Sequence, residues 1–203
     1  MLKQLFRILT AATALAIILS LIPFQNSCKE LYSDVFRVHM IPNSNSAFDQ
    51  SLKLSVRDAV LAAISPLYEK ADSKEDAMRI TEEHLPLIEQ TANRVIRDSG
   101  ANYAVTAKIE NTYFNTRYYD NFTMPAGFYD ALKLTIGEGK GDNFWCVMYP
   151  ALCVGAATRN QLKEDLDEGE YAVVSSDDLE FRFKIVEYYE RLRSHFMTLT
   201  TNN

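Results

Sequence analysis

Residues 136–153, IGEGKGDNFWCVMYPALC, hold the densest set of side chains in the chain that could carry chemistry. A phosphate-binding loop requires a serine or threonine after its Gly-Lys pair, but Lys140 is followed by a glycine. A dinucleotide-binding fingerprint requires a further glycine where Asp142 stands, and the strand-like FWCVMY then follows in place of a helix. We therefore expect no nucleotide cofactor here. The prediction is a structural turn between two strands, built on three alternate glycines: Gly137, Gly139 and Gly141.

The two cysteines of this segment allow two interpretations. Cys146 and Cys153 are too far apart for C-x-x-C redox chemistry, and a zinc site would need two more ligands. In an exported domain the pair is a candidate disulfide that closes a proline-containing loop, and two buried free thiols are the alternative. No metal is expected.

One weak constellation remains for catalysis. His39 could act as a general base, with Arg57 and Asp58 on a nearby helix, which motivates an alternative function as an exported hydrolase of cell-wall or peptide substrates. A histidine on a strand is more often simply packed, and the sequence contains no G-x-S-x-G or H-E-x-x-H motif. We therefore predict that the protein is not an enzyme.

The N-terminus indicates export. Lys3 and Arg7 precede an uncharged apolar run over residues 8–24, which is typical of a secretory signal and borders on the length of a membrane anchor. Residues 1–28 are predicted to be a signal peptide or membrane anchor, and residues 29–203 a single extracytoplasmic domain. The net charge of −6 and a pI near 5.1 argue against a nucleic-acid partner.

The remaining pattern predicts an α+β fold. Strands are expected at 35–42, 103–110, 129–136 and 143–149. Helices are expected from Ser46 to Pro66, with Asp49 completing a capping-box-like start, from a second cap at Ser73 to Gly100 with a kink or break at Pro86, and over 177–196. Residues 111–127 carry five aromatic side chains and are expected to form a long ordered loop. The expected architecture is a layered sandwich of a mostly antiparallel sheet with helices packed on it.

Four segments resemble the stage II sporulation protein R family of endospore-forming Firmicutes. They are FRVHMIPNSNS, DQSLKLSVRDAVL, MPAGFYDALKLTIGEGKGDNFWCVMYPALC and FRFKIVE, and they run in the family's order between residues 35 and 190. The third is the most specific, because the family reads IG-x-G-x-G-x-NWWCV-x-FPPLC there. This chain departs from that pattern at Phe144, where tryptophan is usual, and at Ala151, where a second proline is usual.

The resemblance implies a signalling role. Proteins of this family are made in the forespore, are exported into the space between the two septal membranes, and trigger a membrane-embedded aspartic protease of the mother cell that processes the sigma-E precursor. No cofactor or small-molecule substrate is implied. The candidate partner-binding residues are Asn43, Ser44, Arg117, Tyr118, Gly139 and Lys140, although Asn43 and Ser44 could simply end a strand and the glycines could only turn the chain.

Overall fold

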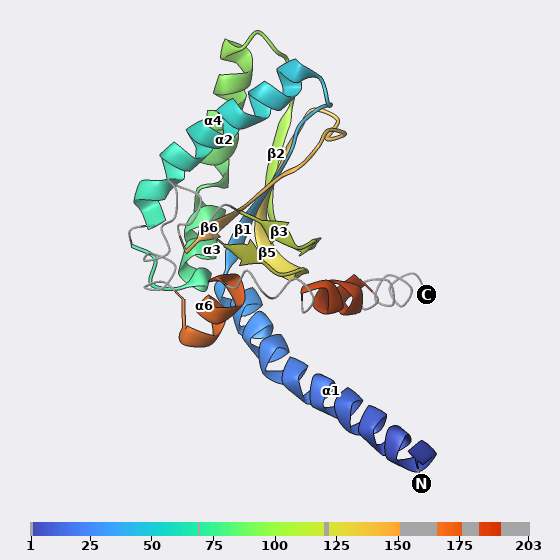
Figure 1. The fold of residues 1–203 in the computed structure, drawn as a ribbon. Helices are drawn as coiled ribbons and strands as arrows, with labels where there is room; N and C mark the ends of the chain where they lie inside the picture. The colour runs from blue at the N-terminus through green and yellow to red at the C-terminus, as the bar shows by residue number, and fades with distance from the viewer. Residues whose placement is uncertain (1, 69, 120–121, 151–165, 176–182, 192–203) are drawn as a thin grey trace, which may run out of the picture. The chain divides into compact units, whose positions relative to one another are not determined.

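The computed structural model describes residues 2–68, 70–119, 122–150, 166–175 and 183–191 (Figure 1). The chain divides into two compact units. The first unit comprises Met1–Tyr32, Tyr113–Gly127 and Lys163–Asn203, and the second comprises Ser33–Thr112 and Phe128–Leu162. The predicted leader boundary at residue 28 falls inside the first helix of the first unit, and the division into a leader and one domain stays a prediction.

The second unit is built on a four-stranded sheet with the order β2-β5-β1-β6. The strands are β1 (Phe36–Ile41), β2 (Val105–Phe114), β5 (Gly127–Ile136) and β6 (Phe144–Tyr149). β1 pairs antiparallel with β6, and hydrogen-bond partners 104 with 137 and 111 with 130 show that β2 and β5 are also antiparallel. The mostly antiparallel sheet of the prediction is confirmed. The parallel pairing of β1 with β5, from Phe36 opposite Asp130 to Ile41 opposite Thr135, was not predicted.

Strand β1 is buried on both faces, which its alternating sequence did not indicate. Arg37 is fully buried beside the apolar residues of the strand, and His39 is only 5% exposed. The Arg37 guanidinium carbon lies 4.8 Å from the centre of the Tyr129 ring, and its Nε donates to the Cys146 carbonyl at 3.5 Å. His39 stacks on Trp145 with ring centres 3.7 Å apart. Neighbouring strands and aromatic rings therefore replace water around both polar side chains.

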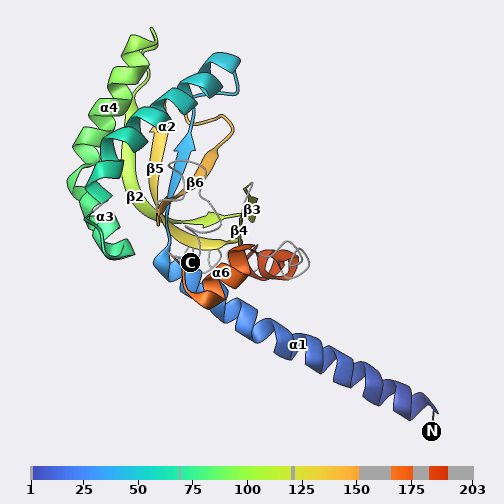
Figure 2. The ribbon, with the colours of Figure 1, turned by 60° about the vertical axis from the view of Figure 1, so that its left-hand side comes forward.

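Three helices cover one side of this sheet (Figure 2). They are α2 (Ala47–Tyr68), α3 (Lys74–Glu83) and α4 (Leu85–Asp98). Ser46 and Ser73 cap α2 and α3, because each hydroxyl accepts from the backbone N–H three residues later at 3.1 Å. Pro86 lies in the first turn of α4, so the predicted break is confirmed. Gly100 follows α4 at a φ of 77°, as predicted for a residue that ends a helix.

The first unit contains α1 (Leu2–Asp34), α6 (Glu168–Ser175) and a helical segment at 183–191. It also contains the short antiparallel pair β3 (Arg117–Tyr118) and β4 (Thr123–Met124). The expectation of a long loop over 111–127 was therefore wrong, since β2 extends to Phe114 and β3 and β4 follow. Helix α6 was missed because it is short; Asp167 caps it by accepting from the Glu170 N–H at 2.7 Å.

The helix predicted over 177–196 is confirmed only for its described part, residues 183–191. Among the helices that the structure describes, none combines the length and apolar character that a bilayer crossing demands. The predicted N-terminal anchor is accordingly not confirmed.

Candidate functional site

The candidate site lies in the second unit, where the glycine segment (residues 137–143) meets the loop that follows β1. β5 and β6 are not neighbours in the sheet, because β1 lies between them. The glycine segment turns the chain between these two strands, as predicted, and crosses the end of β1 to do so. The Lys140 N–H donates to the Asn43 carbonyl at 3.2 Å, and the Gly141 N–H donates to the Pro42 carbonyl at 3.1 Å.

Two of the three glycines have backbone angles that side chains rarely adopt. The φ angles of Gly137 and Gly139 are 58° and 61°. Gly141 is constrained differently: a Cβ atom there would lie 2.7 Å from the ring of Pro42 and would overlap the Ser44 carbonyl. The glycine segment can thus cross the end of β1 because Gly137 and Gly139 adopt left-handed conformations and because Gly141 lets its backbone lie close to the loop after β1.

Asp49, in the first turn of α2, organises the loop after β1. Its Oδ2 accepts a hydrogen bond from the Ser44 hydroxyl at 2.6 Å and another from the Asn43 amide at 3.0 Å. The other end of the Asn43 amide, Oδ1, accepts from the Glu138 N–H at 3.0 Å. Asn43 therefore connects α2 to the glycine segment, and Asp49 holds Asn43 in the orientation that this connection requires.

A second connection runs through Lys53, one turn further along α2. Its ammonium donates to the Gln50 Oε1 at 2.7 Å and to the Asp142 carbonyl at 2.8 Å, and the side chain is only 6% exposed. Asn45 completes the arrangement, since its Oδ1 accepts from the Asp142 N–H at 2.6 Å and from the Gln50 amide at 3.1 Å. The far end of the glycine segment is thus fixed to the same helix.

These contacts shift the pKa values of the charged side chains at the site. Hydrogen bonding from Ser44 is the largest cause that lowers the pKa of the Asp49 carboxyl, and it outweighs the opposing effect of burial. Burial lowers the pKa of the Lys53 ammonium. At the exposed tip, the Lys140 ammonium lies 2.8 Å from a Glu138 carboxylate oxygen, and this contact lowers the pKa of Glu138 and raises that of Lys140.

Of the six candidate partner-binding residues, the structure brings four together: Asn43, Ser44, Gly139 and Lys140. Arg117 and Tyr118 form β3 in the first unit, where Tyr118 is exposed. Asn43 and Ser44 direct their side chains into the protein, and Lys140 is the exposed member of the four. Lys53 and Asn45 were not among the predicted site residues, and Asp49 was expected only to complete a capping box, because no local signal in the sequence links these residues to the glycine segment.

The structure describes one of the two cysteines of the predicted disulfide. Cys146 is buried in β6, but Cys153 lies outside the described residues, so the disulfide stays a prediction. Cys28 is a buried free thiol.

The residues behind the hydrolase alternative do not form a catalytic arrangement of the expected kind. His39 is buried against Trp145, whereas Arg57 and Asp58 pair with each other at 2.6 Å. Arg57 also covers the Phe144 ring at 5.0 Å. Within the described part of the chain, no group of three His, Cys, Asp or Glu side chains could hold a metal ion.

Comparison with known proteins agrees with the resemblance of the sequence motifs. A family model described as Stage II sporulation protein R matches residues 32–159. A Stage II sporulation protein R from Bacillus subtilis is 38% identical over 117 residues, which are 58% of this chain and 52% of that protein. The chain thus matches about half the length of this curated relative. No solved structure matches. The family match includes every residue of the candidate site, and the chain belongs to the stage II sporulation protein R family.

Proposed function

We propose that this chain is an exported signalling protein of sporulation that passes from the forespore into the space between the septal membranes. There it activates a membrane-embedded aspartic protease of the mother cell, which processes the sigma-E precursor. The observation that carries the proposal is the family match over residues 32–159, because the family is described by its part in stage II of sporulation. The receptor, the compartment and the absence of catalysis by the chain itself are parts of the proposal.

The geometry of the candidate site supports a binding role. The described polar side chains around the glycine segment are hydrogen-bonded to one another or to the segment itself. A loop that is already fixed loses little conformational entropy when a partner binds it. A short loop held by two connections to α2 can therefore present its tip in one conformation.

The tip itself indicates what a partner would contact. Glu138 and Lys140 are 67% and 74% exposed and form an ion pair. An exposed ion pair of this kind contributes little to stability, so both side chains can form ion pairs with charged groups of a partner instead. We expect the extracytoplasmic surface of the protease to place a cationic group near Glu138 and an anionic group near Lys140.

Site-specific photocrosslinking in sporulating cells tests the contact directly. A photoreactive residue at position 140 is expected to yield an adduct with the protease. The same residue at position 79, on the exposed face of α3, serves as the matched control, because Arg79 is also exposed and ion-paired. An adduct from position 79 and none from position 140 would contradict the proposed surface.

A genetic experiment separates the function from the surface. Deleting the gene should abolish processing of the sigma-E precursor, and normal processing in the deletion strain would refute the signalling proposal altogether. A Lys140→Glu variant should reduce processing while leaving the thermal unfolding midpoint almost unchanged, since the pair is exposed. Normal processing in this variant would refute only the charge contact.

A further inference from the structure

The exposure of α1 changes abruptly within the helix. Upstream, the described apolar side chains face solvent: Leu5, Phe6, Ile8, Leu9, Leu15 and Ile22 are 49–68% exposed. Downstream, Phe24 is 5% exposed, and Cys28 and Leu31 are completely buried. The change falls at Pro23, the proline inside this helix. Two segments of one helix therefore have different surroundings.

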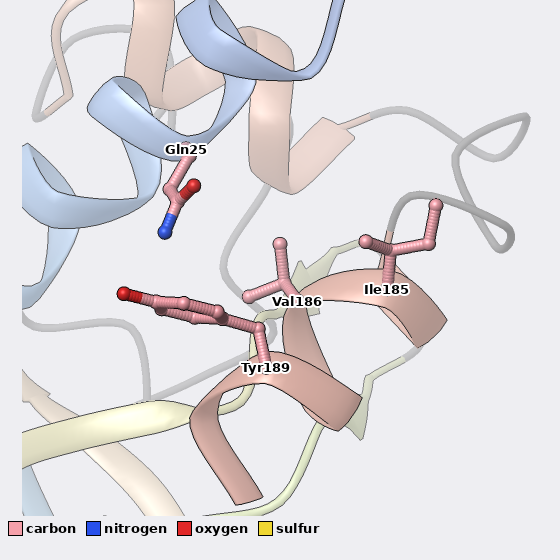
Figure 3. A pocket seen from close by; sticks show the side chains of 4 residues that line it. All are labelled: Gln25, Ile185, Val186 and Tyr189. Carbon is pink, nitrogen blue, oxygen red and sulfur yellow. The ribbon is translucent and has the colours of Figure 1, made fainter. Parts of the chain in front are cut away.

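The downstream segment, residues 24–32, is held by the rest of the first unit. Phe24 contacts Phe183 edge to face, with ring centres 5.5 Å apart and planes at 70°. Gln25 points toward Tyr189 across a small cavity of about 90 Å³ that Ile185 and Val186 also line (Figure 3). These contacts connect the start of the segment to the helical residues 183–191.

The end of the same segment contacts other parts of the unit. The Tyr32 hydroxyl donates to the Ala126 carbonyl at 2.7 Å, and a Cβ atom on Gly127 would lie 2.6 Å from the Tyr32 ring. Ser27 lies so close to α6 that a Cβ atom on Gly169 would be 2.8 Å from its hydroxyl. The segment thus contacts three separate stretches of the unit and is a structural part of it.

We propose that residues 24–32 are the first folded segment of the mature extracytoplasmic domain, so that any cleavage of the leader occurs upstream of Phe24. This places the boundary before the predicted one at residue 28. Removing residues 24–28 would take Phe24 away from Phe183 and Ser27 away from Gly169. The proposal does not depend on the identity of the protease partner, because it concerns only where the folded domain begins.

The burial of Cys28 supplies an internal probe. Burial raises the pKa of its thiol to about 12, and its thiolate is the form that alkylating reagents attack. In a Lys29→Cys variant of the full-length chain, the new thiol stands on the exposed side of the helix, next to Cys28. The two positions lie on one peptide, so mass spectrometry compares them within the same molecule.

We expect maleimide to label Cys28 at least about 100-fold more slowly than position 29 in the native protein, and equally fast in urea. Equal rates in the native protein would overturn the docking of this segment. N-terminal mass analysis of the protein from sporulating cells should give a start at or before Phe24. A start after residue 24, or a lipid attached to Cys28, would overturn the proposed boundary.

Discussion

Asp49 gives the sharpest test of how the candidate site is held. An Asp49→Ala substitution removes an acceptor that binds Ser44 at 2.6 Å and Asn43 at 3.0 Å, in a side chain that is 3% exposed. Each hydrogen bond to a charged group contributes about 1.5–3 kcal/mol. Asn43 and Ser44 are half-buried, so water can satisfy part of what they lose. We therefore expect the free energy of unfolding to fall by about 3 kcal/mol, a large part of the stability of a typical domain.

Urea unfolding followed by circular dichroism measures this loss. The matched control is Asp58→Ala, in the same helix, where the carboxylate is 65% exposed and pairs with its neighbour Arg57. The control should lose less than about 1 kcal/mol. If the two variants unfolded at the same urea concentration, the proposed organising role of Asp49 would be refuted. Asp49→Asn, which keeps the shape and one acceptor oxygen, should fall between the control and Asp49→Ala.

Three further predictions follow from single contacts. Gly139→Ala should lower the thermal unfolding midpoint more than Gly100→Ala. Both changes introduce a side chain at a positive φ, which costs about 1–2 kcal/mol each, but at Gly139 the new Cβ would also lie 2.6 Å from a neighbouring atom; equal shifts in the midpoint would contradict this. In Glu89→Ala, the free energy of unfolding should fall by about 1–2 kcal/mol, because the Glu89 carboxylate accepts a hydrogen bond from the Ala107 N–H at 2.8 Å on the outer strand β2. The uncovered strand edge should also promote aggregation, measured by light scattering, and a variant that stays monomeric would count against this. Folding lowers the pKa of Asp49, so the stabilisation from its carboxylate is complete above the unfolded pKa of about 3.9 and is lost as the pH falls through the folded value. The urea midpoint of the Asp49→Asn variant should therefore depend less on pH below about 4 than that of the unchanged protein.

Local signals predicted the helices of the second unit well. Ser46 and Ser73 were identified as caps, Pro86 as a break and Gly100 as an end, and each of these features depends on atoms within a few residues. Strand positions were also predicted, because alternation and β-branched residues mark them locally. What the sequence could not provide was the order of the strands.

The strand order could not be predicted, for a physical reason. A glycine segment between two consecutive strands is typical of a hairpin, which would place β5 beside β6. In the structure β1 lies between them, and its position depends on contacts with residues far along the chain. The same limit applies to Arg37 and Lys53, whose charges indicate exposure locally, whereas their partners at Tyr129 and Asp142 are distant.

The central position of β1 constrains the order in which the chain can fold. Phe36 pairs with Asp130 on one side and with Tyr149 on the other. β1, the first strand in the chain, therefore cannot pair on both sides until β5 and β6 have been synthesised. Helices α2 and α4 can meet earlier, but the sheet gains its centre only when β5 and β6 arrive. In a chain that emerges N-terminus first, these helices could therefore pack before β1 is paired, and β1 would gain both neighbours only once residue 149 had emerged. Pairing of β1 with β5 and β6 would then complete the surface around the glycine segment in one late step.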